Sequence, residues 1–328
     1  MNAPAPAAAE PLSFAKKSKV YEVPAPLAPL ADTHGHMTCF WDKDPAEVLV
    51  RAARAGVRLL VVPYDPVADG MTPREFAAAL DAWIERAGAA GDVAPLADSV
   101  FFLAGVHPYG APDYTDDVHA RVMEALGLDR CRGIGEIGLD YHFDADDQIE
   151  AAPHDVQISC MERQLGIALE RGLPVELHLR NDAGDDRRAA HRDAYRVLSE
   201  TGVPEAGCVL HCFGEDRACM ERFCDLGCYI AFGGASTFKR NDAVREAFAA
   251  CPLDRVLFET DCPYMAPEPI RGIECEPAMI SFTVDALCRD RAARTGEDPA
   301  EIARAAWENS CRLFGCRDGV ACGGPAQA

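Results

Sequence analysis

Short apolar runs alternate with longer amphipathic stretches along this chain. The runs are continuously apolar and do not alternate with polar residues, which is typical of parallel strands buried on both faces. We identify eight of them, at residues 30–34, 57–63, 100–106, 133–137, 174–179, 208–212, 229–233 and 255–260. Each run is followed by a stretch with helical character, so the pattern predicts a repeated strand–helix unit.

The stretches between the runs repeat their apolar positions with helical spacing. Clear examples lie at residues 45–55, 156–171, 192–201, 218–226 and 242–250. One helix start is marked by Thr72 as N-cap, Pro73 at the first helical position and Glu75 three residues after the cap. Eight strand–helix alternations favour an α/β fold with a single closed (β/α)8 TIM barrel over an open sheet.

The two ends of the chain differ in composition from the rest. Residues 1–28 are rich in alanine and proline, and we expect a disordered leader before a barrel domain over residues 29–317 and a flexible tail at 318–328. No apolar stretch approaches the ~20 residues that span a bilayer, and the start lacks a secretory signal. We therefore expect a cytoplasmic protein without a membrane partner. The fifteen cysteines are scattered and odd in number, which predicts reduced thiols.

Histidines and carboxylates recur at the ends of the apolar runs. Because the carboxyl ends of parallel strands meet at one mouth of a barrel, these side chains are expected to converge there. Two of the histidines are two residues apart and face the same side of the chain. The candidate metal ligands are His34, His36, Glu136, His178, His211 and Asp261.

Six nitrogen and oxygen ligands are too many for one four-coordinate catalytic zinc ion with an open position. They suit two divalent ions with a bridging carboxylate, and Glu136 lies on the strand between the two histidine groups. Mixed imidazole and carboxylate ligands fit zinc, manganese or iron and leave magnesium possible, so the pattern does not select the metal.

These motifs together resemble the TatD-type metal-dependent hydrolases of the amidohydrolase-like barrel superfamily. The matching segments, in chain order, are Asp32-Thr-His-Gly-His36, Gly105-Val-His-Pro108, Gly135-Glu-Ile-Gly-Leu-Asp-Tyr141, His178-Leu-Arg180, His211-Cys-Phe-Gly214, Glu259-Thr-Asp-Cys-Pro-Tyr264, Arg271-Gly272 with Glu276-Pro277, and Asn309 with Arg312-Leu-Phe314. The resemblance implies a divalent-metal nuclease, often a 3′–5′ exonuclease acting on DNA.

The chain departs from the family pattern away from the ligands. Tyr109 stands where the family commonly has a second histidine, and Cys275 stands where an asparagine usually precedes the Glu-Pro pair. The loops at residues 144–150 and 181–186 are acidic and are expected to overhang the site. The net charge of −21 would also repel a polyanion at long range. These features concern which substrate the protein acts on, because none of them replaces a candidate metal ligand.

Two hypotheses follow for the reaction. In the first, a metal-bridging hydroxide attacks phosphorus in DNA or a small phosphodiester, and Asp261 takes the proton while Glu136 bridges the ions. Glu259 would orient a ligand or the water. Phosphate contacts are expected from His107, Arg180, Lys239 and Arg271. No protein partner is implied.

In the second hypothesis the same hydroxide attacks the carbonyl of a small amide, ester or lactone. The acidic surface favours this reaction over hydrolysis of a polyanion. Against it, many binuclear members of the superfamily carry a modified lysine on strand four, whereas this chain has Glu136 there and no lysine in residues 131–141.

Overall fold

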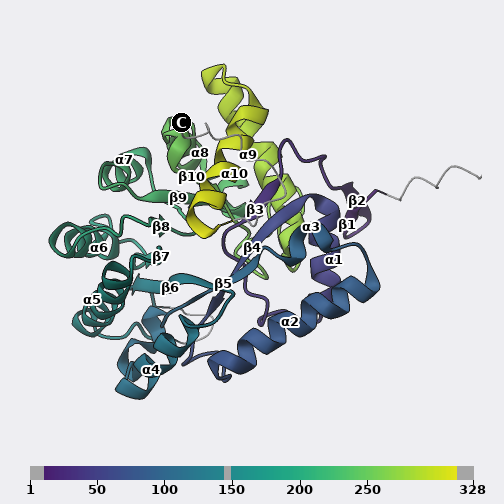
Figure 1. Cartoon of the computed structure of the whole chain (residues 1–328). Helices are drawn as coiled ribbons and strands as arrows, with labels where there is room; N and C mark the ends of the chain where they lie inside the picture. The colour runs from purple at the N-terminus through teal and green to yellow at the C-terminus, as the bar shows by residue number, and fades with distance from the viewer. Residues whose placement is uncertain (1–10, 144–148, 316–328) are drawn as a thin grey trace, which may run out of the picture.

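The computed structural model describes residues 11–143 and 149–315. Eight parallel strands form one sheet, and each pairs with its neighbour in chain order (Figure 1). The strands are β3 (Leu30–Asp32), β4 (Val57–Tyr64), β5 (Val100–Ala104), β6 (Cys131–Asp140), β7 (Val175–Arg180), β8 (Cys208–Leu210), β9 (Tyr229–Phe232) and β10 (Val256–Phe258). Their burial is nearly continuous, as in β4, where seven of eight residues are buried and one is intermediate.

The sheet closes on itself just beyond the ends of β3 and β10. Thr33 N donates to Phe258 O at 3.1 Å, and Asp261 N donates to His34 O at 2.9 Å. A parallel bridge between Gly35 and Cys262 continues this seam. The sheet is therefore a closed TIM barrel, and the predicted fold is confirmed.

Helices surround the barrel (Figure 1). They are α1 (Pro45–Ala55), α2 (Pro73–Ala90), α3 (Ala94–Ala97), α4 (Asp116–Ala125), α5 (His154–Arg171), α6 (Ala189–Thr201), α7 (Arg217–Asp225), α8 (Asp242–Ala250), α9 (Ile280–Thr295) and α10 (Pro299–Phe314). The predicted start of α2 is confirmed, because Thr72 and Glu75 form a reciprocal capping box. Short 3₁₀ turns η1 (Pro108–Asp113), η2 (Gly234–Thr237), η3 (Leu253–Arg255) and η4 (Pro277–Met279) lie in the connections.

The amino-terminal half of the barrel interior is apolar. Alternate strand residues, such as Leu59 and Val61 of β4 and Leu103 of β5, form one buried cluster with Trp307 and Phe314 of α10. A larger cluster lies between the sheet and the surrounding helices. The polar side chains of the barrel interior therefore lie at the opposite, carboxyl-terminal mouth.

The expected disordered leader is wrong for residues 11–28. Strands β1 (Ser13–Lys16) and β2 (Lys19–Glu22) form an antiparallel hairpin. Phe14 is buried, and its ring centroid lies 6.4 Å from that of Phe282 on α9. Composition missed the hairpin because its support comes from a segment more than 260 residues away in sequence. Residues 1–10 and the predicted tail at 318–328 lie outside the described residues.

Candidate metal centre

The six predicted ligands meet at the carboxyl-terminal mouth of the barrel, at the base of an open cavity of about 1370 Å³. Five of them line the cavity, and His34 lies fully buried beside them. Four follow the end of a strand, but Glu136 and His178 lie inside β6 and β7. The prediction that all six end their strands is therefore wrong for these two, because both strands continue beyond the apolar runs that marked them.

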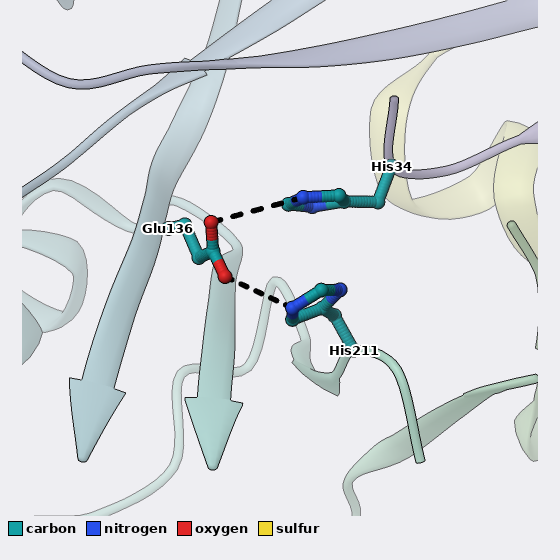
Figure 2. Close-up of side chains that lie close together, drawn as sticks. All are labelled: His34, Glu136 and His211. Carbon is teal, nitrogen blue, oxygen red and sulfur yellow. Dashed lines mark ion pairs between the residues drawn. The ribbon is translucent and has the colours of Figure 1, made fainter. Parts of the chain in front are cut away.

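Glu136 lies between two groups of ligands, and Figure 2 shows its two carboxylate oxygens turned toward one member of each group, His34 and His211. Its Oε2 lies 3.7 Å from His34 Nε2 and 4.0 Å from His36 Nε2. Its Oε1 lies 2.7 Å from His178 Nδ1 and 2.9 Å from His211 Nε2. We call His34, His36 and Asp261 the first group, and His178 and His211 the second group, with Glu136 shared between them.

Asp261 completes the first group from the far side of the barrel seam. Its Oδ1 lies 3.6 Å from His36 Nε2 and 3.9 Å from His34 Nε2. The preceding residue, Thr260, is held by Asp32, whose carboxylate accepts from Thr260 N at 2.8 Å and from its hydroxyl at 2.6 Å. These bonds anchor the turn that carries Asp261 into the cavity.

The donor set fits divalent cations. Within each of two trios, His34–Glu136–His211 and His34–His36–Asp261, one potential ligand atom per residue lies within 4.8 Å of the others. Burial lowers the pKa of His34 to about 4 and that of His36 to about 3, so both imidazoles are neutral, as ligands must be. Burial opposes ionisation of Glu136, but His211 and His34 outweigh it and hold its pKa well below the usual range.

Three of the ligand histidines, His34, His178 and His211, each have a carboxylate beside the second ring nitrogen. The pairs are His34 Nδ1 with Glu176 Oε1 at 2.6 Å, His178 Nε2 with Asp140 Oδ2 at 3.2 Å, and His211 Nδ1 with Glu259 Oε1 at 3.5 Å. A carboxylate in this position orients the ring and selects which nitrogen carries the proton. The other nitrogen of each ring faces Glu136, although Nδ1 of His211 makes no hydrogen bond among the described residues.

A third trio, His107, Asp140 and His178, is close enough to hold a cation. It competes with the second group for His178, since a neutral imidazole has one lone pair. His178 lies between two carboxylates, with Nδ1 2.7 Å from Glu136 Oε1 and Nε2 3.2 Å from Asp140 Oδ2. Burial opposes protonation of the ring, but hydrogen bonds to Asp140 and Glu136 outweigh it and raise the pKa of His178 to about 9. A neutral ring that gave its Nδ1 lone pair to an ion beside Glu136 would keep its proton on Nε2, facing Asp140. We therefore interpret Asp140 as the orienting partner of His178 and not as the ligand of a third ion.

The predicted substrate contacts divide into two pairs. His107 and Arg180 line the cavity, whereas Lys239 and Arg271 are exposed and do not line it. Arg271 instead lies over the ring of Phe238, 4.0 Å from its centroid. Lys239 follows η2 and Arg271 lies in the loop after β10, and neither is among the described lining residues, so a phosphate contact from either one stays a prediction.

The rim of the cavity is acidic. The expected overhang of the 181–186 loop is seen in Asp182, Asp185 and Asp186, which line the cavity; residues 144–148 lie outside the described part of the chain. Among the described lining residues the arginines are Arg180 and Arg188. Arg188 is already paired, with Glu215 at 2.9 Å and with Asp216 at 2.6 Å.

Sequence reasoning missed Glu176 and Asp140. Glu176 precedes His178 by two residues on β7, and this spacing places both side chains on one face of a strand. The signal that could have identified Glu176 is a single carboxylate within an otherwise apolar, buried strand. Asp140 ends the segment that contains Glu136, at the last position of β6.

The departures from the family pattern lie around these groups. Tyr109 lines the cavity, and its backbone N donates to His107 Nδ1 at 3.2 Å. Cys275 is buried outside the cavity lining, and its backbone N donates to Pro263 O at 2.9 Å. Tyr109 is therefore placed to meet a substrate, whereas Cys275 is part of the packing behind the site.

The profile of the family described as TatD-related DNase matches residues 31–315. The uncharacterized metal-dependent hydrolase YabD of Bacillus subtilis is 31% identical over 287 residues, which cover 87% of this chain and 98% of the relative. A Rahnella protein named 3′-5′ ssDNA/RNA exonuclease TatD is 29% identical over 280 residues, covering 84% and 93%.

Among solved structures, the TatD homologue YJJV from Escherichia coli superposes with a TM-score of 0.69 and 28% identity, over 89% of this chain and 100% of that one. A lactonase from Listeria monocytogenes superposes with a TM-score of 0.60 and 13% identity, over 87% and 94%, which shows a shared fold alone. The family profile, the full-length relatives and the cluster of metal-ligating side chains agree. The chain belongs to the TatD-related DNase family and is a metal-dependent hydrolase.

Proposed function

We propose that this protein hydrolyses phosphodiester bonds at the 3′ ends of single-stranded DNA with the help of two divalent ions. The observation that carries the proposal is the position of Glu136, which turns one carboxylate oxygen toward each of two ligand groups. A bridging carboxylate between two ions is the typical architecture of two-metal phosphoryl transfer. The Rahnella relative named as an exonuclease supports the substrate class.

The first group with Glu136 Oε2 would hold one ion, and the second group with Glu136 Oε1 would hold the other. Imidazole and carboxylate donors suit zinc, manganese or iron and also permit magnesium. When bound, the ions supply Lewis acidity, which lowers the pKa of a water molecule and stabilises charge on the phosphate oxygens.

Asp261 is the proton acceptor in this proposal. It lines the cavity and contributes to the first group, so it faces the space where an attacking water must stand. A carboxylate beside divalent cations stays ionised at neutral pH and can take the proton of that water. Glu259 is buried, with Oε1 3.5 Å from His211 Nδ1, and it is not among the described lining residues, so we assign it to orienting that ring and not to the attacking water.

His107 is placed to bind a phosphate oxygen. Its Nδ1 accepts a hydrogen bond from Tyr109 N, so the proton of the neutral ring lies on Nε2. Burial lowers the pKa of His107 to about 3, which keeps the ring neutral. Nε2 lies 4.0 Å from Glu136 Oε1 and therefore presents an N–H donor beside the shared carboxylate. Arg180, also in the lining, would bind the next phosphate.

The acidic rim favours an end over the middle of a strand. A long duplex would bring many phosphates against Asp182, Asp185 and Asp186, whereas a single-stranded end brings few. The test is a time course on 5′-labelled single-stranded and double-stranded oligonucleotides with purified, metal-loaded protein. Products that shorten one nucleotide at a time from the 3′ end of the single strand are expected; internal cuts in duplex would contradict the proposal.

A second candidate is the hydrolysis of a small amide, ester or lactone, which the acidic lining favours because such substrates need not be anionic. The two reactions are separated by assaying one metal-loaded preparation on single-stranded DNA, a bis-aryl phosphodiester and a set of lactones and amides. Turnover of a lactone with no cleavage of either phosphodiester would reverse our preference.

A further inference from the structure

We propose that Glu176 is a positioning residue of the first metal site, which sets the tautomer of His34 and thereby makes its Nε2 a ligand. The inference rests on the metal centre of the proposed function but not on the identity of the substrate. Glu176 belongs to β7, and its Oε1 lies 2.6 Å from His34 Nδ1, a contact between residues 142 apart in sequence.

Glu176 is held where its carboxylate has little else to bind. Its side chain is 1% exposed, and Oε2 has no hydrogen-bond partner among the described residues. Its register partner on β8 is Val209, a member of the apolar cluster inside the barrel. A carboxylate buried above an apolar core is costly unless a specific interaction requires it, and His34 is the partner that Glu176 has.

The backbone next to Glu176 is adapted to this contact. Gly135 precedes the shared ligand Glu136 on β6, and a Cβ at Gly135 would lie 2.9 Å from Glu176 Cβ. A side chain there would push Glu176 away from His34. The glycine therefore lets the positioning carboxylate and the bridging carboxylate stand on adjacent strands.

The tautomer of His34 decides between two states of the first group. His34 Nε2 lies 3.1 Å from His36 Nε2. If Nε2 carried the proton, it would donate to His36, and the two rings would satisfy each other without an ion. When Glu176 is ionised and accepts from Nδ1–H, the lone pair of His34 lies on Nε2, next to the second ring and to Asp261. Asp261 Oδ1 lies 3.9 Å from His34 Nε2 and 3.6 Å from His36 Nε2.

The experiment compares Glu176→Leu and Glu176→Gln with wild type and with His36→Ala. Chelator-stripped protein is titrated with Zn²⁺ and Mn²⁺ by calorimetry, and the melting temperature is measured in excess chelator. Nitrogen NMR of ¹⁵N-histidine protein reports the tautomer of His34. Leucine has no acceptor, whereas the glutamine amide oxygen can still accept from Nδ1. The His36→Ala variant is the control, because it shows how the calorimetric titration changes when the first metal site is lost.

We expect Glu176→Leu to weaken one of the two binding sites about 10- to 100-fold and to leave the other unchanged. Because leucine leaves the buried Nδ1–H of His34 without an acceptor, the melting temperature of this variant without metal should be lower than that of wild type. Glu176→Gln should retain the Nδ1–H tautomer and lose less affinity and less stability. A loss of affinity confined to one site, together with a change in the His34 tautomer that the glutamine variant does not share, is not expected of a residue with a merely structural role.

Glu176→Leu protein that binds both ions with wild-type affinity would overturn the inference, as would an equal loss of affinity at both sites or an unchanged tautomer of His34. If His36→Ala removes one ion and Glu176→Leu does not, the metal centre stands and the role of Glu176 is wrong. If His36→Ala removes none, the proposed centre and this inference are both wrong.

Discussion

The floor and the rim of the cavity are built in different ways. On the floor, His34 is fully buried, Glu136 contacts both ligand groups, and the second nitrogens of the buried rings face carboxylates. On the rim, Asp113 and Asp186 are exposed. Rigid strands hold the floor, whereas loops carry the rim. The difference indicates that the reaction depends on the floor and that the choice of substrate depends on the rim.

Glu136→Gln is expected to have the largest effect. The amide cannot serve two ions as a charged bridge, so turnover should fall further than the ~10²–10⁴-fold typical of a lost general base. The core does not depend on this charge, so the melting temperature without metal should stay close to that of wild type. The measurements are kcat and bound metal by elemental analysis. A metal-loaded variant with near-normal kcat would remove Glu136 from its bridging role.

Replacing His34 and His36 together by alanine should remove about one equivalent of metal. Both nitrogens belong to the first group, whereas His178 and His211 remain to hold the second ion. The metal content is measured after dialysis against a fixed free-metal concentration. A double variant that keeps the wild-type metal content would show that the two groups are not separate sites.

Asp261→Asn should lower kcat by about 10²–10⁴-fold while leaving most of the metal in place. The amide is isosteric and can still reach His36, but it cannot accept the proton of the attacking water. The measurement is kcat at saturating metal across a pH series. Retention of more than about a tenth of the wild-type kcat would move the role of base to another group.

Changes at the rim should be small and should appear in KM alone. Asp113→Asn with Asp186→Asn removes two exposed charges from the cavity lining. At low salt we expect KM for single-stranded DNA to fall about two- to fivefold with kcat unchanged, since exposed charges interact weakly through water. The difference should disappear near 0.5 M salt, where screening is nearly complete. A change in kcat would mean that rim and floor are coupled.

Wild-type affinity for DNA should depend weakly on salt for the same reason. Screening reduces the repulsion from the rim while it weakens phosphate contacts with Arg180. The slope of log Kd against log salt is measured for a single strand that carries a blocked 3′ end. A steep slope, typical of many phosphate contacts, would contradict the assignment of the rim.

The apolar runs predicted the barrel because strand and helix periodicities are local properties. They placed α1 and α8 at their observed bounds, and they marked the residues that meet at the mouth. The ligands were recognisable because their chemistry is carried by residue type and by position after a strand. Residue type and position after a strand can both be identified without knowing which distant segments of the chain are in contact.

Other features depend on partners far away in sequence. The hairpin near Phe14 packs against α9, and Arg271 lies over the ring of Phe238, 33 residues earlier in the chain, so neither contact could be obtained from composition or motif. The sequence by itself determined which groups are available for metal chemistry. Only the tertiary structure decided which group faces each nitrogen of His34, because Glu176, which lies 2.6 Å from Nδ1, is on the opposite side of the barrel interior and 142 residues along the chain.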